Sequence, residues 1–180
     1  MKNPDRNRRG SDREAESHPA SEAASMTVAA RHWRWGWWSL LGFLCLGLVL
    51  EALHGFKDPG YVSPSQSTRR LMWTLAHAHG TLLAVVQLCF AAFLGSSVAR
   101  GADLGPGGVR RREWASVLLL ASQSLLPGGF LLGGWFFRGG DPGIGVFLVP
   151  VGAVCLAVAV GLIAASAGGP AKRPQTSPEP

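Results

Sequence analysis

The chain has 180 residues, of which 47% are apolar and only 16% charged, and 17 Lys and Arg against 11 Asp and Glu leave a net charge of +6. Soluble domains carry about 25% charged residues, and the few charges here gather in the first 34 residues, in short connectors and near the C-terminus. This distribution excludes a soluble globular enzyme. It also argues against a nucleic-acid partner, despite the positive charge.

The N-terminal region is polar. Residues 1–30 are rich in Ser, Asn, Arg, Glu and Asp, with almost no apolar side chain larger than alanine until residue 26. Such a composition buries too little surface to offset the entropy of ordering, so we expect a disordered cytoplasmic tail. The apolar run 35–52 follows it. A long mixed-charge region precedes this run and no A-x-A site follows it, so it is predicted to be a retained helix and not a signal peptide.

Three further apolar runs follow, each bordered by basic residues. The four predicted transmembrane helices lie at about 35–52, 71–94, 114–137 and 143–166. A hydrocarbon core of about 30 Å requires around 20 helical residues, and none of the runs alternates with the two-residue period of a membrane barrel. The sequence therefore predicts an all-α fold, an integral membrane four-helix bundle over residues 31–168, with a second disordered tail at 169–180.

The basic residues predict the orientation of these helices. If the N-terminus lies inside, thirteen Lys and Arg fall on the cytoplasmic side and four on the outer side. Cytoplasmic loops of membrane proteins carry the excess of Lys and Arg. We therefore expect a multi-pass protein of a cell membrane, in contact with the lipid bilayer, with both termini in the cytoplasm.

Small and polar residues at three-, four- or seven-residue steps predict which helix faces approach each other. Three such stripes are expected to face inward: Ala76, Gly80, Ala84, Gln87 and Ala91; Ala121, Ser124 and Gly128; and Gly145, Gly152 and Ala159. Pro127 and Pro150 are expected to kink the third and fourth helices. Self-association through these stripes into a homo-oligomer is a further expectation.

Four ionisable residues in the first two helices are the candidate site residues. Glu51 and His54 end the first helix three residues apart, on one face, and His77 and His79 lie roughly 9–12 Å into the second. All four are expected towards the outer leaflet, where they can converge on one site. Ionisable groups at membrane depth usually pair, face a cavity or hold a cofactor. His32, beside the membrane, carries little information.

The two histidines of the second helix are expected to play different roles, because residues i and i+2 point about 200° apart. His77 lies nearer the small-residue stripe and is the first candidate to ligate haem b or a transition metal. His79, His54 and Glu51 are a second ligand or supports. In the alternative interpretation each histidine forms a hydrogen bond between helices, with no ligand. A tetrahedral zinc site is weakly indicated, because no i, i+4 pair of histidines occurs.

The run Ala76-His77-Ala78-His79-Gly80, in the second of four short helices, resembles the hydroxylaminobenzene mutase and styrene oxide isomerase group. The resemblance implies an oligomeric four-helix protein that holds haem b through the matching histidine, His77. It also implies that the iron acts as a Lewis acid on a small oxygenated substrate. His79 stands where the mutase-like pattern has Glu. The His-x-His pattern also looks like small relatives of haem-copper oxidase subunit I.

Two functional hypotheses follow. In the first, the chain is a small membrane protein that binds haem or a metal through the histidines of its second helix, and redox or isomerase chemistry depends on that cofactor. In the second, it is a non-catalytic accessory subunit or permease-like bundle whose histidines only join helices. Whether the protein is an enzyme stays open between them.

Overall fold

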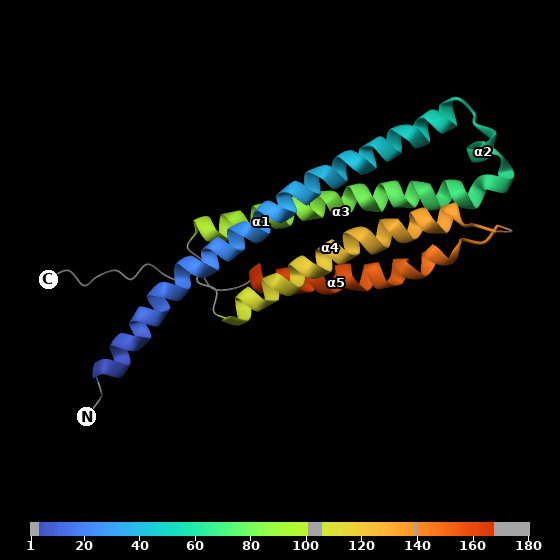
Figure 1. Ribbon diagram of the computed structural model, residues 1–180. Helices are drawn as coiled ribbons and strands as arrows, with labels where there is room; N and C mark the ends of the chain where they lie inside the picture. The colour runs from blue at the N-terminus through green and yellow to red at the C-terminus, as the bar shows by residue number, and fades with distance from the viewer. Residues whose placement is uncertain (1–3, 101–105, 139, 168–180) are drawn as a thin grey trace.

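The computed structural model describes residues 4–100, 106–138 and 140–167, with side chains over 22–100, 107–138 and 140–166. Its elements in chain order are α1 (Pro4–Gly55), α2 (Pro59–Val62), η1 (Pro64–Gln66), α3 (Ser67–Ala99), α4 (Pro106–Trp135), η2 (Ile144–Phe147) and α5 (Leu148–Ala167) (Figure 1). The described residues form no strand, apart from one isolated bridge between Arg138 and Asp141. The all-α prediction is confirmed.

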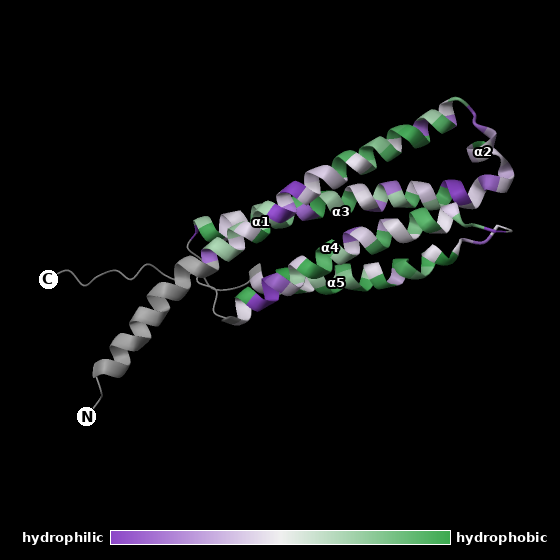
Figure 2. Cartoon of the chain, in the orientation of Figure 1, coloured by the Kyte–Doolittle hydropathy of each residue, from purple (hydrophilic) through white to green (hydrophobic). Residues whose placement is uncertain are grey.

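Four of the helical segments are long and apolar enough to cross a membrane: Glu22–Gly55, Pro64–Ala99, Gly107–Trp135 and Ile144–Ser166. Hydrophobic residues cover most of their length, and hydrophilic ones gather towards the helix ends and in the connecting segments (Figure 2). Each segment contains or closely matches one predicted helix. The prediction of four membrane-spanning helices is thus borne out by length and composition.

The four long helices pack in sequence order, as an open row. α1 packs on α3, α3 on α4 and α4 on α5, while α1 meets α4 at only a few positions (Figure 1). Within the described residues, the backbone of α5 does not come close to that of α1 or α3, although Ala159 of α5 shares a buried cluster with Phe90 and Leu94 of α3. α3 and α4 are therefore the middle of the row, and a closed four-helix bundle is not confirmed. We call the end of the row that holds α2 and η2 the turn end, and the opposite one, where α3 stops and α4 starts, the tail end.

The predicted packing faces of α3 and α5 are buried. All five residues of the α3 stripe are buried, and Ala76, Ala84 and Gln87 are fully inaccessible. Gly145 of η2 and Gly152 of α5 lie against α4, where an added Cβ would come within 2.3 Å of the Cβ of Leu132 and 2.7 Å of the Leu126 nitrogen, respectively. Small residues here allow close approach of the two backbones.

The predicted packing face of α4 is wrong. Ser124 is exposed, its hydroxyl donates to the Leu120 carbonyl of its own helix, and an added Cβ at Gly128 would meet open space. The side that packs carries the buried residues Ala115, Ser116, Leu119, Ser122, Gln123, Leu126 and Phe130. Polar and small residues occur on more than one side of this helix, so their spacing alone selects the wrong stripe.

Helix α1 starts before residue 30, the predicted end of the N-terminal tail. Helix α1 begins at Pro4, and Ala29 is buried in a cluster with Phe90 and Leu94 of α3 and Leu119 of α4. Residues 22–30 thus extend the membrane helix, because their alanines favour helix and their apolar side packs on the row. The predicted tail at 169–180 lies outside the described residues.

Neither proline interrupts a helix. Pro127 is buried within α4, which continues to Trp135. Pro150 is the third residue of α5, in the first turn, where its missing N–H removes no bond within the helix. The change from η2 to α5 lies just before it, between Phe147 and Leu148.

Candidate functional site

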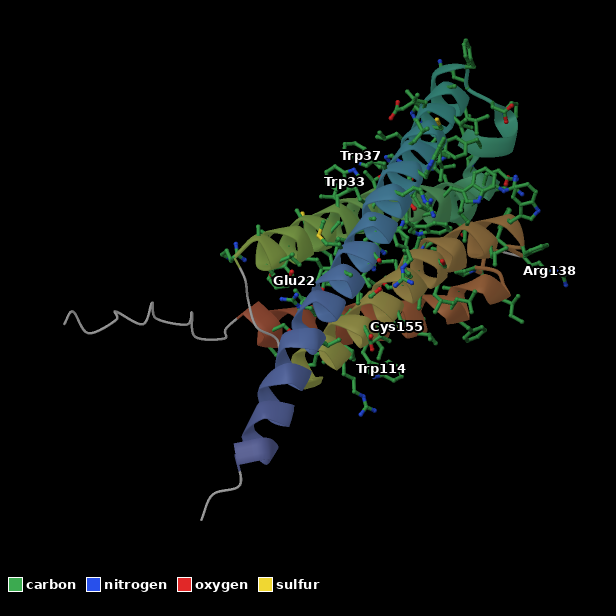
Figure 3. All side chains as sticks on the ribbon, turned by 60° about the vertical axis from the view of Figure 1, so that its left-hand side comes forward. Glu22, Trp33, Trp37, Trp114, Arg138 and Cys155 are labelled. Carbon is green, nitrogen blue, oxygen red and sulfur yellow. The ribbon has the colours of Figure 1, made fainter. Side chains whose placement is uncertain are left out.

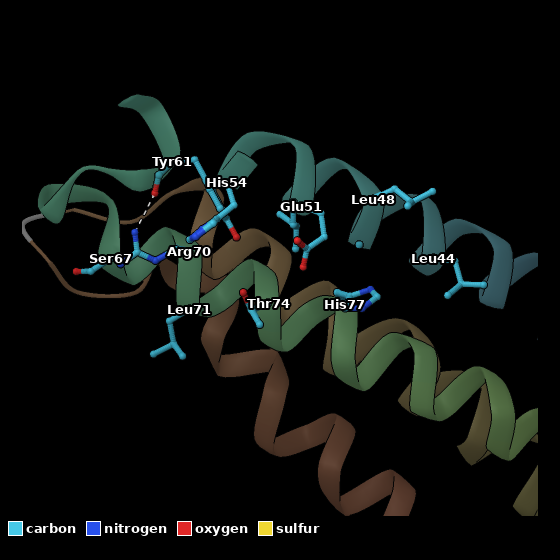
Figure 4. A pocket seen from close by; sticks show the side chains of 12 residues that line it. Leu44, Leu48, Glu51, His54, Tyr61, Ser67, Arg70, Leu71, Thr74 and His77 are labelled. Carbon is cyan, nitrogen blue, oxygen red and sulfur yellow. Dashed lines mark hydrogen bonds between the residues drawn. The ribbon is translucent and has the colours of Figure 1, made fainter. Parts of the chain in front are cut away.

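A cavity of about 1010 Å³ lies at the turn end, between the last part of α1 and the first part of α3 (Figure 4). Its volume is at the upper end of the range, about 300–1,000 Å³, of small-molecule and cofactor sites. The lining residues are Leu44, Gly47, Leu48, Leu50, Glu51, His54, Tyr61, Ser67, Arg70, Leu71, Thr74 and His77. Leucines form much of the wall, and most of the polar groups lie nearer the turn, so the cavity is amphipathic.

The turn between α1 and α3 holds the two helices apart. Lys57 has a positive φ of 53°, which ends α1, and the Asp58 carboxylate accepts a bond of 2.8 Å from the Gly60 nitrogen at the start of α2. Arg70 of α3 donates from Nη1 to the carbonyls of Tyr61 (3.3 Å) and Val62 (3.2 Å). These bonds fix α2 against α3, so α1 diverges and the cavity stays open.

His77 lines the cavity from α3. Its Nδ1 is 2.7 Å from the Phe43 carbonyl of α1, and because a carbonyl only accepts, Nδ1 carries the proton. In the neutral ring, Nε2 therefore keeps its lone pair. Gly47 makes this position accessible, since an added Cβ there would lie 2.5 Å from His77 Cε1.

A second contact between a ring and a glycine joins α1 and α3 beside the first. Phe43, which accepts the bond from His77, places its ring over Gly80 of α3, where an added Cβ would be 2.3 Å from Phe43 Cδ1. The His77 ring of α3 thus packs against Gly47 of α1, and the Phe43 ring of α1 packs against Gly80 of α3. The orientation of His77 is set by a backbone hydrogen bond and by close packing together.

The cavity brings together three of the four predicted site residues. Glu51, His54 and His77 all line it (Figure 4), and the side chains of Glu51 and His54 are exposed. Among the described residues, no group of three His, Cys, Asp or Glu side chains is arranged to hold a metal ion. The three residues share a cavity, but they do not form a ready-made coordination site for a free ion.

His79 lies outside this cavity. Its Nδ1 is 2.9 Å from the Leu75 carbonyl of its own helix, and its ring is centred 5.0 Å from the ring of Phe130 on α4. His77 thus faces α1 while His79 packs against α4. This is the separation expected of residues two apart on a helix.

A buried polar network at His32 was missed by the sequence analysis. His32 of α1 is fully inaccessible and packs edge-on against Phe90, with the ring centres 4.9 Å apart. Its Nδ1 donates to Gln87 Oε1 of α3, and its Nε2 accepts from Ser116 Oγ of α4 at 2.7 Å. The imidazole therefore joins three helices at one point.

The network continues at both ends. Arg31 Nη2 donates to Ser116 Oγ at 2.6 Å, and Gln87 Nε2 donates to the Leu119 carbonyl at 3.0 Å. All donors point the same way along this chain, from Arg31 to Leu119, so one neutral tautomer of His32 satisfies both ring nitrogens. The available signal in the sequence was Gln87, a polar residue within an otherwise small or apolar stripe, which implied a buried partner.

Comparison with protein-family models, with curated proteins and with solved structures finds no match for this chain. The cavity between α1 and α3 and the orientation of His77 are therefore the observations on which a functional proposal rests.

Proposed function

We propose that this chain is a membrane protein that binds haem b in the cavity between α1 and α3, where His77 Nε2 would hold the iron. One observation carries the proposal: the Nδ1 of His77 donates to the Phe43 carbonyl, while its ring lines an apolar-walled cavity. A ligating histidine commonly donates its other N–H to a carbonyl, which fixes the tautomer and raises the basicity of the free nitrogen.

Haem suits this site better than a free metal ion. The macrocycle supplies four nitrogen ligands, so the protein needs only one or two axial groups. The leucine walls would contact the porphyrin, Arg70 would pair with a propionate, and His54 is the second imidazole in the same cavity. When bound, haem would supply redox or Lewis-acid chemistry.

The expected orientation places this cavity in the outer half of the membrane, with both termini in the cytoplasm. The excess of Lys and Arg on the N-terminal side supports it. A membrane-impermeant thiol reagent should label a cysteine placed at Ser65 from outside intact cells and one placed at Arg100 only after lysis. The reverse pattern would contradict the orientation.

Absorbance spectra of the detergent-purified full-length chain, oxidised and then dithionite-reduced, test haem binding. Protein from haem-replete cells should show a Soret band near one haem per chain. His77→Ala should lose the band, and His79→Ala, which removes an imidazole from the same helix outside the cavity, should retain it. A colourless wild-type protein, or an unchanged spectrum of His77→Ala, would contradict the proposal.

A second candidate is the non-catalytic bundle whose histidines join helices. The bond from His77 to Phe43 favours it, because this bond connects α3 to α1 whether or not a ligand is present. In this case the purified wild type is colourless, and His77→Ala lowers the thermal midpoint without any spectral change. The same set of samples therefore separates the two functions.

A further inference from the structure

The tail end of the row holds a buried arginine that the proposed function does not use. Arg112, in the second turn of α4, is only 7% exposed. Its guanidinium carbon lies 5.4 Å from the centre of the Phe93 ring on α3. This aromatic contact compensates part of the cost of removing the charge from water, by about 0.5–2 kcal/mol.

One nitrogen of the Arg112 guanidinium lacks a partner. Among the residues that the structure describes, Nε is buried and forms no hydrogen bond. Buried charges are normally paired, because an unpaired one loses its hydration without compensation. Two nearby arginines do have hydrogen-bond partners. Arg31 donates to Ser116, and Arg111 donates to the Ala165 carbonyl of α5 at 3.5 Å.

A small cavity lies beside this guanidinium. It is enclosed by Ser25 and Val28 of α1, Leu94 of α3, and Val109 and Arg112 of α4, and its volume is about 20 Å³. That space admits one water-sized atom, such as a single oxygen of a larger anion. α4 begins at Pro106, so the positive end of its helix dipole lies near the same place.

We propose that this cavity binds a phosphate oxygen of an anionic phospholipid, with Arg112 as the recognising group. The planar guanidinium matches phosphate through paired N–H···O bonds. A lipid is the favoured source because the site lies at headgroup depth: Trp114, two residues further along α4, is 53% exposed, and tryptophan gathers at the membrane–water interface (Figure 3).

One acidic residue lines the same cavity. Glu113 is exposed at its rim, so its carboxylate opposes an anion only weakly, as exposed charges contribute about 0–1 kcal/mol. Removing this charge should therefore strengthen lipid binding by about two- to fivefold. A lipid with net negative charge, and not a zwitterionic one, neutralises the buried charge of Arg112.

The test measures the thermal midpoint of the detergent-purified full-length chain as phosphatidylglycerol, phosphatidylcholine or inorganic phosphate is added. Phosphatidylglycerol should stabilise the wild type more than phosphatidylcholine does. Arg112→Gln should weaken this binding about tenfold or more, the value of a charge-assisted hydrogen bond, and Arg110→Gln, an exposed arginine of the same run, should not. Glu113→Gln should strengthen it.

Two further arms keep the test decisive. Without anionic lipid, Arg112→Gln should be at least as stable as the wild type, because it removes a buried charge. If that variant does not fold, Ser25→Val fills this small cavity from α1 and leaves the guanidinium in place, and it should lose the phosphatidylglycerol effect. Equal stabilisation of wild type and variants would overturn the site, and equal stabilisation by inorganic phosphate would overturn a lipid as its source. Haem binding at the turn end is independent of either result.

Discussion

Helices α1 and α3 meet through a histidine at two places, and the two contacts differ in how the imidazole is used. Towards the tail end, His32 is fully buried, and both ring nitrogens have partners on α3 and α4. Towards the turn end, His77 is half-buried, with one nitrogen bonded to the Phe43 carbonyl and the ring at a cavity. The first contact joins three helices and the second joins two.

This difference separates a structural histidine from a candidate ligand. An imidazole with both nitrogens satisfied inside a packed core has no capacity left for a metal or a substrate. An imidazole with one nitrogen fixed and the other unprotonated is prepared for ligation.

The largest effect is expected from His32→Ala. The change removes two hydrogen bonds and leaves buried groups of Gln87 and Ser116 without partners, which costs about 1–3 kcal/mol for each. The variant should therefore lose about 3 kcal/mol or more of stability in reversible unfolding from detergent, and His77→Ala distinctly less. Equal losses in the two variants would remove the distinction between the contacts.

A smaller and more selective effect is expected from Gly47→Ala. The new methyl group would meet the His77 ring at 2.5 Å, so the ring must move away from its bond to Phe43. Haem affinity should fall about tenfold, since one orienting bond to a ligating histidine is worth about 10–100-fold, while stability changes by about 1–3 kcal/mol.

Gly42→Ala is the matched control for this change. It lies on the same helix, and an added Cβ there meets nothing within 4 Å. Alanine is the better helix former, so this variant should keep both its spectrum and its stability. Loss of haem in both variants would show that any added methyl group on α1 disturbs binding, and not specifically a shift of the His77 ring.

The sequence was sufficient to predict the four helices, but it predicted only some of the contacts between them. Continuous apolar runs and few charges identify spans whatever their neighbours are, so the four segments were predicted. The packing face of α4 was not, because its polar residues, including Ser122, Gln123 and Ser124, occupy adjacent positions and only the neighbouring helices decide which are buried.

The sequence also predicted part of the candidate site and missed part of the buried polar network. The geometry of one helix was enough to separate His77 from His79, and three of the four candidates do share a cavity. His32 was missed because its burial depends on Gln87 and Ser116, residues 55 and 84 positions away along the chain. Local composition carries no information about such contacts.

The most direct test of the account is chemical rescue of His77→Gly. In the proposed function, the His77 imidazole would hold the iron of haem in the turn-end cavity. The purified variant, mixed with haem, should show no protein-bound Soret band, and free imidazole should restore one, because it can occupy the space that the side chain leaves. A band of wild-type position and intensity without imidazole would contradict this assignment.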